Sequence, residues 1–284
     1  MYIAVYIKLL RPNQWLKNLM LFFPPFLAGA LRTEAIFSSG LLPFAAFCLA
    51  SSAAYIFNDI RDIERDRSHP DKQNRPLASA AVAVNTAAML AAALLVASLI
   101  LAAALPDRFF LYLVAYLVVS FCYSFYLKNY PVIDLFCISS GFILRLLAGG
   151  EIFGVAVSEW LFLCVFLLAI FLSTGKRLAE KGVLSLLTHD HRKVLALYPE
   201  GFLDGLLYMT GSAVLVAYSI YVINRHSLLL LYTVPLCAFG LFRYILRVKS
   251  GKSGDPTESL THDMQLFLVG LLWAVMVGFG IYGR

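Results

Sequence analysis

Charged residues are scarce in this sequence: Asp, Glu, Lys and Arg make up only 14% of its 284 residues, whereas 61% are hydrophobic and the mean hydropathy is +0.79. A typical soluble domain carries about 25% charged residues. This shortage excludes a water-soluble globular protein, because there is too little polar surface to cover the apolar side chains. The composition predicts an integral membrane protein whose first partner is the lipid bilayer.

Cysteine is also scarce, and the five cysteines show no close pair and no spacing typical of a metal site. They are Cys48, Cys122, Cys137, Cys164 and Cys237. All lie within apolar runs, where a free thiol behaves as a small hydrophobic side chain. This pattern excludes a disulfide framework and a cysteine-based metal centre.

Long apolar runs are abundant, and about nine of them reach the length of about 20 residues that a membrane-spanning helix requires. The expected spans are Trp15–Leu31, Ala35–Phe57, Val82–Leu105, Phe109–Leu127, Val132–Gly150, Val155–Gly175, Leu203–Ile223, Leu228–Leu246 and Met264–Tyr282. No small-residue cleavage pattern follows the first run, so we expect it to be retained as a span. The sequence predicts an all-α polytopic membrane protein with a single domain over residues 1–284.

The basic residues are distributed unevenly over the expected loops. Of 23 Lys and Arg residues, 18 lie before the first span, in the loops after spans two, four, six and eight, or, as for Lys17 and Arg243, in the adjoining turn of a span; four lie in the other loops, and Arg145 alone lies deep within a span. Cytoplasmic loops carry an excess of basic residues. We therefore predict a multi-pass protein of the inner (plasma) membrane with a cytoplasmic N-terminus and its active site at the cytoplasmic face. Dispersal of the basic residues argues against a nucleic-acid partner.

An acidic motif, Asn58-Asp59-x-x-Asp62-x-x-x-Asp66, stands where the second span ends. With about 100° of rotation per helical residue, these four side chains fall within about 100° on one helix face. Clustered carboxylates favour a cation, and hard oxygen ligands favour Mg²⁺ held jointly with substrate phosphates. The alternative is a solvated acidic face in which Arg61 and Arg65 form helical ion pairs. That alternative does not explain polar groups at the apolar edge, where they are costly and usually functional.

Basic side chains accompany this motif at the same membrane face. Arg75 follows in the next polar loop and is able to bind a phosphate group through two parallel hydrogen bonds. Lys128 and Asp134 lie between the fourth and fifth spans, while Lys176 and Arg177 close the sixth. Arg145 lies about 16 Å along the fifth span and requires a partner. That partner is either a structural carboxylate or an anionic substrate group in a water-accessible cavity.

The acidic motif resembles the first Asp-rich motif of the UbiA-type prenyltransferase superfamily, whose members have nine helices. Further elements resemble its phosphoribosyl-transferring branch, the decaprenyl-phosphate phosphoribosyltransferases, over nearly the whole chain. They are Arg11-Pro12-x-Gln14-Trp15-x-Lys17-Asn18, Arg75-Pro76, Tyr123-Ser124-x-x-Leu127-Lys128, Ser140-Gly141-Phe142-x-x-Arg145 and Gly175-Lys176-Arg177. The resemblance implies a helical bundle around a central cavity open to the cytoplasmic side.

One departure from the superfamily pattern concerns the loop after the sixth span. Members that transfer a prenyl group carry a second motif there, Asp-x-x-x-Asp, whereas this chain has Lys176, Arg177, Glu180 and Lys181. The departure argues against an aromatic prenyl acceptor. The segment Gly251–Glu258, after the eighth span, is similar to a stretch of the phosphoribosyl relatives, but its composition is also that of a simple turn.

The resemblance implies Mg²⁺-dependent transfer of 5-phosphoribose from phosphoribosyl diphosphate to a polyprenyl phosphate, with release of diphosphate, in the synthesis of a cell-envelope precursor. Asn58, Asp59, Asp62 and Asp66 would hold Mg²⁺ on the diphosphate, and the same three carboxylates, with Lys128 and Asp134, would form the catalytic set. The expected substrate-binding residues are Lys17, Asn58, Arg75, Tyr123, Lys128, Arg145, Lys176 and Arg177.

Two other functions share some of these features. A prenyltransferase that acts on an aromatic acceptor would have the first Asp-rich motif but also the second one. A transporter or lipid flippase would suit many spans and an intramembrane arginine, yet the sequence shows no inverted repeat and no pair of broken helices.

Overall fold

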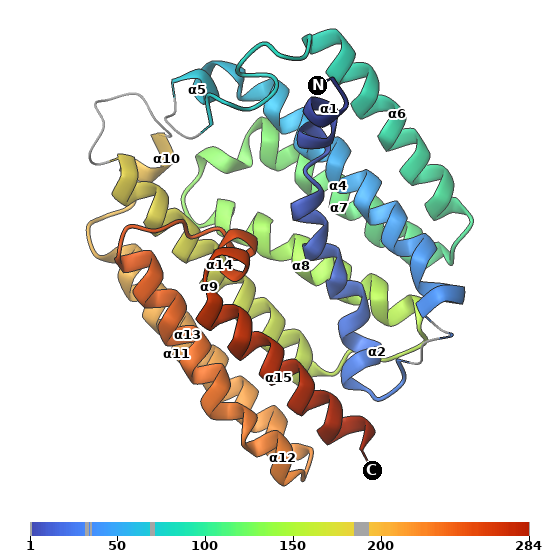
Figure 1. The fold of residues 1–284 in the computed structure, drawn as a ribbon, viewed down its shortest axis with the longest axis vertical. Coiled ribbons are helices and arrows are strands. Elements are labelled where there is room, and N and C mark those ends of the chain that lie inside the picture. The colour runs from blue at the N-terminus through green and yellow to red at the C-terminus, as the bar shows by residue number, and fades with distance from the viewer. Residues whose placement is uncertain (1, 32–33, 35, 69–71, 185–192, 284) are drawn as a thin grey trace. The chain divides into compact units, whose positions relative to one another are not determined.

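The computed structural model describes residues 2–31, 34, 36–68, 72–184 and 193–283. Within these residues the chain is built from helices joined by turns and loops, without a β-strand (Figure 1). The all-α prediction is therefore confirmed for the described part of the chain. Helices satisfy their own backbone hydrogen bonds, as a segment that crosses lipid must.

Eight segments of the described chain are long and apolar enough to cross a membrane. They contain α4 (Leu41–Arg61), α6 (Val84–Ala103), α7 (Asp107–Phe125), α8 (Ile133–Ile152), α9 (Glu159–Leu184), α11 (Phe202–Asn224), α12 with α13 (Leu228–Leu231 and Thr233–Lys249) and α15 (Met264–Tyr282). They correspond to the second through ninth predicted spans, and the protein is a polytopic membrane protein.

The first predicted span, Trp15–Leu31, differs from expectation because it is not one long α-helix. After α1 (Tyr2–Leu10), the chain forms a 3₁₀-helix, η1 (Pro12–Phe22), followed by the short α2 (Phe23–Leu27). Pro24 and Pro25 have no backbone N–H and cannot donate the α-helical bonds to residues four positions earlier. The Phe23 N–H bonds instead to the Met20 carbonyl, three residues back, in the 3₁₀ pattern.

Two compact units make up the chain. Unit 1 comprises Met1–Pro24, Leu31–Tyr130 and Leu144–Ala156, and unit 2 comprises Pro25–Ala30, Pro131–Ile143 and Val157–Arg284. Helix α8 contributes its first half to unit 2 and its second half to unit 1.

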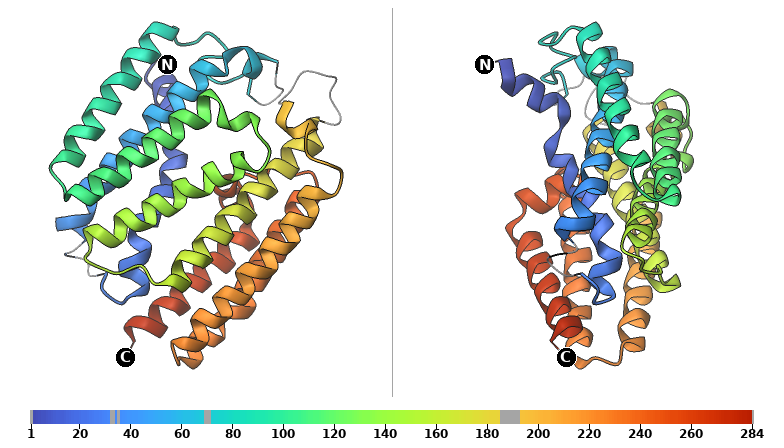
Figure 2. Two further views of the ribbon diagram at one scale, coloured as in Figure 1. Left: turned by 180° about the vertical axis from the view of Figure 1, so that it is seen from behind. Right: turned by 90° about the vertical axis from the view of Figure 1, so that its right-hand side faces the viewer.

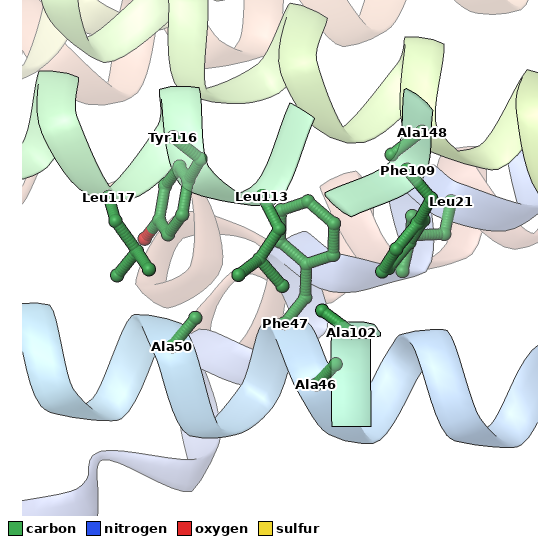
Figure 3. Packing of buried hydrophobic residues seen from close by; sticks show 10 residues of the cluster. All are labelled: Leu21, Ala46, Phe47, Ala50, Ala102, Phe109, Leu113, Tyr116, Leu117 and Ala148. Atoms are coloured by element: carbon green, nitrogen blue, oxygen red, sulfur yellow. The ribbon is translucent and has the colours of Figure 1, made fainter. Parts of the chain in front are cut away.

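Unit 1 packs α4 against α6 and α7 (Figure 1). Figure 3 shows Phe47 of α4 pointing toward α7, where its ring meets Phe109 edge-on at 5.6 Å between centroids. Alanines 46 and 50 on the same stretch of α4 are fully buried, so small side chains alternate with the large ring and let the helices approach closely. Helix α8 contacts η1 at Gly149, where a Cβ atom would clash with the Leu21 carbonyl oxygen.

Unit 2 pairs α9 with α11, which run side by side in the left view of Figure 2, and α13 with α15. Its core is formed by Phe171 of α9, Leu207 and Val214 of α11, and Tyr244 of α13. Three short helices connect these elements: α10 (Lys193–Ala196) before α11, α12 before α13 and α14 (Pro256–His262) before α15. A further short helix, α5 (Ile63–Arg67), and two short segments, η2 (Ile36–Gly40) and η3 (Leu127–Asn129), belong to unit 1.

Candidate active site

The three aspartates of the acidic motif are buried, with Asp59 at the end of α4, Asp62 between α4 and α5, and Asp66 in α5. Asp59, Asp62 and Asp66 expose only 2%, 9% and 5% of their surface. Charged carboxylates at such low exposure require charged or hydrogen-bonded partners. This burial contradicts the alternative of a solvated acidic face.

The one-face prediction assumed a continuous helix, but the helix that carries the motif is interrupted. Asp62 has φ −105° and ψ 9°, so α4 ends at Arg61 and α5 begins at Ile63. The four-residue hydrogen-bond spacing is nevertheless kept across the break, because the Asp62 N–H bonds to the Asn58 carbonyl at 3.0 Å and the Asp66 N–H to the Asp62 carbonyl at 2.8 Å. The motif therefore bends at Asp62 without losing its register.

Each aspartate of the motif is held by a cation from elsewhere in unit 1. Arg11 donates from one Nη2 to both oxygens of Asp59, at 2.5 and 2.7 Å. Arg75 bridges two carboxylates, with 3.1 Å to Asp59 and 2.7 Å to Asp66. Lys128 donates to Asp62 at 2.5 Å. Three separated segments thus place three cations on the three predicted carboxylates.

Arg11 was not among the predicted site residues, although it opens one of the motifs quoted above. It stands between α1 and η1 with φ 53° and ψ 59°, a left-handed conformation that is uncommon for a residue other than glycine. Its guanidinium also lies over the Tyr55 ring at 5.4 Å. This conformation, strained for a side chain of its size, is where the chain turns to bring Arg11 onto Asp59.

Asn58 begins the motif and has a buried side-chain oxygen, Oδ1, with no hydrogen-bond partner among the described residues. A buried acceptor without a partner is costly and points to an absent ligand or water. Across the described residues, no three His, Cys, Asp or Glu side chains lie close enough together to hold a metal as a group. The three aspartates instead face cations, with Arg75 shared between Asp59 and Asp66 and Lys128 on Asp62.

Lys17 and Tyr123, two other predicted substrate contacts, are partly buried in unit 1. Lys17 lies in η1, and Tyr123 lies in the last turn of α7, five residues before Lys128. Both are therefore placed in elements that also supply or adjoin the cations of the acidic motif.

Arg145 is buried within unit 1, with 4% of its surface exposed. Its Nε donates to the side-chain oxygen of Asn18 at 2.7 Å, and its guanidinium lies over the ring of Tyr116 at 4.3 Å and that of Phe47 at 5.6 Å. An amide oxygen and two aromatic faces therefore help stabilise the charge, contacts that the sequence did not reveal.

Asp134 and Arg177 form a buried ion pair in unit 2, where Arg177 Nε lies 2.5 Å from Asp134 Oδ2 and Arg177 Nη1 lies 2.5 Å from Glu180. Tyr198, which was not among the predicted site residues, donates its hydroxyl to Asp134 Oδ1 at 2.7 Å. Burial raises the pKa of Tyr198, so the phenol stays protonated and able to donate. Asp134 therefore has partners on both oxygens.

Tyr198 also holds the start of α8. Its hydroxyl oxygen accepts the backbone N–H of Val132 at 2.7 Å. Val132 has φ 67°, which is strained for a β-branched residue. The residues just before Asp134 are thus kept in an unfavourable conformation by the same hydroxyl that binds its carboxylate.

Lys176 lies one position before Arg177 but in a different environment. It pairs with Asp255 at 3.0 Å, and its side chain is 34% exposed. Asp255 also caps α14 by accepting the N–H groups of Thr257 and Glu258. The segment Gly251–Glu258 is therefore more than a flexible turn, because it supplies the carboxylate partner of a predicted substrate contact.

Comparison with known proteins identifies the family. The model of the UbiA prenyltransferase family matches residues 21–271. A decaprenyl-phosphate phosphoribosyltransferase of Mycolicibacterium smegmatis is 32% identical over 97% of this chain and 92% of its own length. One from Corynebacterium glutamicum is 34% identical over 97% of this chain and 86% of its own.

Solved structures agree on the fold. A UbiA homolog from Archaeoglobus fulgidus, bound to GPP and Mg²⁺, superposes with a TM-score of 0.72 at 21% identity, over 99% of this chain and 100% of that one. A UbiA homolog from Aeropyrum pernix has a TM-score of 0.63 at 17% identity, over 99% of this chain and 98% of that one. With the family model covering most of both units, the chain belongs to the UbiA prenyltransferase family.

Proposed function

We propose that this protein transfers a 5-phosphoribosyl group from phosphoribosyl diphosphate to a polyprenyl phosphate and releases diphosphate. The observation that carries this proposal is the near full-length similarity to two proteins named decaprenyl-phosphate phosphoribosyltransferase, at 32% and 34% identity. The buried set of carboxylates and cations in unit 1 supplies groups suited to a diphosphate. A role as a transporter or flippase has no comparable support.

The donor set of unit 1 suits Mg²⁺ by the chemistry of its oxygen atoms, although in this structure the three aspartates are paired with cations and are not grouped around one point. Three buried carboxylates and the Asn58 amide oxygen, which has no hydrogen-bond partner among the described residues, are hard oxygen ligands of the kind that Mg²⁺ takes in phosphate sites. Asn58, Asp59, Asp62 and Asp66 would hold the ion. When bound, it would neutralise charge on the diphosphate oxygens. The Mg²⁺-bound UbiA homolog supports a metal requirement in this family.

The cations of unit 1 could leave the aspartates and bind diphosphate oxygens instead. In the structure, Arg11, Arg75 and Lys128 neutralise the aspartates. A cation that binds the aspartates would free these three side chains to donate to diphosphate oxygens. Arg75 is suited to this exchange because it already spans Asp59 and Asp66.

Chemically, the bond between ribose C1 and the diphosphate oxygen breaks, and its electron pair leaves with the diphosphate. A bond forms between C1 and an oxygen of the lipid phosphate. That phosphate is already anionic near neutral pH, with a second pKa of about 6, so no strong general base is needed. The work of the protein is to stabilise charge on the leaving group and to align the two substrates.

The residues of unit 2 divide into two roles. Asp134 is completely buried and bonded on both oxygens, so we assign it to holding Arg177 and the start of α8 rather than to the ribose. Arg177 is 1% exposed and shared between two carboxylates. Lys176, partly exposed with one carboxylate at 3.0 Å, is the better candidate for a substrate phosphate.

We further propose that both units form one catalytic domain with its site at the cytoplasmic face of the inner membrane. The family model spans both units, and α8 contributes residues to each. The positive-inside distribution of basic residues supports the orientation. Reporter fusions at the loops after α4 and α6 test it: the first should report cytoplasm and the second the opposite side.

The decisive experiment incubates purified protein with radiolabelled phosphoribosyl diphosphate and a polyprenyl phosphate, with Mg²⁺ or with a chelator. We expect label in the organic extract only with Mg²⁺. Asp59→Asn and Asp62→Asn should abolish this product, whereas Asp204→Asn, which alters a surface pair with Lys249, should not. Absence of the lipid product, together with activity on a prenyl diphosphate and an aromatic acceptor, would instead place the chain among the prenyl-transferring members.

A further inference from the structure

Ser173 of α9 has a buried hydroxyl that its own helix does not satisfy. The side chain is 3% exposed, and Ser173 Oγ has no hydrogen-bond partner among the residues that the structure describes. Several other helical serines here donate to a carbonyl three or four residues back, as Ser98 does to Leu95 at 2.8 Å, Ser139 to Leu135 at 2.9 Å and Ser219 to Leu215 at 2.8 Å. A buried hydroxyl without such a bond is costly and is left to serve another acceptor.

Lys176 lies on the same side of α9 as this hydroxyl. Residues three apart are neighbours on a helix surface, separated by about 60° of rotation. Thr174 Oγ1 is also without a partner among the described residues. Thr174 is two residues before Lys176, however, so the two side chains point about 160° apart around the helix axis. Helix geometry therefore places Ser173, rather than Thr174, on the side of α9 that carries Lys176.

Asp255, the partner of Lys176, uses different oxygens for its two sets of contacts. Asp255 Oδ2 accepts from Lys176 at 3.0 Å, while Asp255 Oδ1 accepts the N–H groups of Thr257 and Glu258. Loss of the Lys176 contact, which Asp255 Oδ2 makes, would leave the cap of α14 intact, because Oδ1 makes the cap. By contrast, the neighbouring Arg177 is shared between Asp134 and Glu180 deep in the unit.

The loop that carries Asp255 is pinned to α9 at this point. A Cβ atom on Gly254 would lie 2.5 Å from the Gly175 carbonyl oxygen and 2.8 Å from Lys176 Cα, so only glycine permits this approach. The buried Tyr244 hydroxyl lies 2.7 Å from the Gly254 carbonyl oxygen, to which it donates. The position of Asp255 relative to Lys176 is thus set by backbone contact.

From these observations we propose that Ser173 and Lys176 form a binding site for a phosphate monoester, with Asp255 as the counterion that the ligand displaces. A phosphate monoester offers several strong acceptor oxygens and close to two negative charges, which match one ammonium group and one hydroxyl donor. This inference deepens the proposed function, in which both substrates carry such a group: the 5-phosphate of the donor and the phosphate of the lipid.

The test measures binding without turnover on the full-length protein in nanodiscs, using ribose 5-phosphate in one arm and a short-chain polyprenyl phosphate in the other. The arm that responds to the variants identifies the source of the monoester. Ser173→Ala should weaken that ligand about tenfold, as expected for loss of a hydrogen bond to a charged group. Ser139→Ala, a buried serine whose hydroxyl is already bonded, should leave binding unchanged.

Asp255→Asn should act in the opposite direction and tighten binding up to about fivefold, since it removes a competing partly exposed ion pair while the asparagine oxygen still caps α14. A purely structural role would make Ser173→Ala and Asp255→Asn both harmful. Lys176→Gln should abolish binding and serves as a second variant if Ser173→Ala is poorly folded.

Unchanged affinity in Ser173→Ala, or weaker binding in Asp255→Asn, would overturn the inference. Wild-type protein that forms the labelled lipid product but binds neither monoester through these residues would refute this site and leave the proposed function intact. Monoester binding with the predicted variant pattern, but without phosphoribosyl transfer, would refute the proposed function and retain the site.

Discussion

Replacement of Lys128 by methionine tests the buried ion pair that Lys128 forms with Asp62. The two side chains expose only 5% and 12% of their surface, and the ammonium nitrogen lies 2.5 Å from the carboxylate. Methionine has a similar length and no charge. The substitution therefore leaves Asp62 as a buried carboxylate that has lost its closest cation, while Arg65 lies further away at 3.8 Å.

Removal of one partner of a buried pair costs about 3–5 kcal/mol, mainly because the remaining charge stays out of water. For a chain of this size, a loss at the lower end of that range corresponds to a fall of about 5 °C or more in melting temperature. If Lys128 also stabilises the departing diphosphate, as proposed, turnover should fall about 10²–10³-fold.

The assay is thermal unfolding of wild-type and variant protein in the same detergent. Lys249→Met is the matched control, because Lys249 and Asp204 are 2.6 Å apart but expose 48% and 26% of their side chains. A surface pair contributes about 0–1 kcal/mol, so this control should barely change the melting temperature.

Equal shifts in Lys128→Met and Lys249→Met would refute the reasoning, because burial, not distance, is the difference between the two pairs. The double variant Lys128→Met with Asp62→Asn separates stability from function. It removes both buried charges and should recover most of the lost stability, yet it should stay inactive.

Three further predictions concern residues outside the spans. Tyr198→Phe should lower the free energy of unfolding by about 1–3 kcal/mol, because Asp134 and the Val132 N–H lose a buried partner. Burial raises the pKa of Tyr198, so the phenol is protonated at both about pH 7 and about pH 9. The loss of stability measured by thermal unfolding should therefore be the same at these two pH values and shrink only above the ordinary tyrosine pKa of about 10. Val132→Gly relieves a φ of 67° at a side chain that is 38% exposed and should raise stability by up to about 1 kcal/mol, so a lower melting temperature would contradict the assigned strain. Hydrogen bonds from Arg243 lower the pKa of Asp263, so this carboxylate stabilises the fold above about pH 4 and contributes less as the pH falls. In Asp263→Asn the melting temperature should therefore fall less between neutral and acidic pH than it does in the wild-type protein.

The spans could be predicted because a membrane imposes one requirement on every crossing segment, a run of apolar residues of fixed length. That requirement located eight of the nine expected helices. The first expected span, Trp15–Leu31, is not confirmed as a single long α-helix, and there η1 is held to α4 by side-chain hydrogen bonds. Trp15 Nε1 donates to Ser52 at 2.9 Å, and Asn18 Nδ2 lies 3.4 Å from the Ser51 hydroxyl. Such contacts between distant segments leave no mark in hydropathy.

The acidic motif of the site could also be predicted, because Asp59, Asp62 and Asp66 are close in sequence and helical geometry brings them together. Their cations were harder to identify. Arg11 lies 48 positions from Asp59, and Tyr198 lies 64 positions from Asp134. Each of these contacts depends on a single backbone conformation, at Arg11 or at Val132, that residue type alone does not favour.

The residue order was enough to establish that the chain is a helical membrane protein of a recognisable family with an acidic motif at a helix end, because these features depend on local composition and spacing. The assignment of partners needed the folded chain. It shows that Arg177 is buried between two carboxylates, whereas its neighbour Lys176 is partly exposed beside one. Adjacent residues on a helix point about 100° apart, so two neighbouring cations that look equivalent in sequence meet different surroundings.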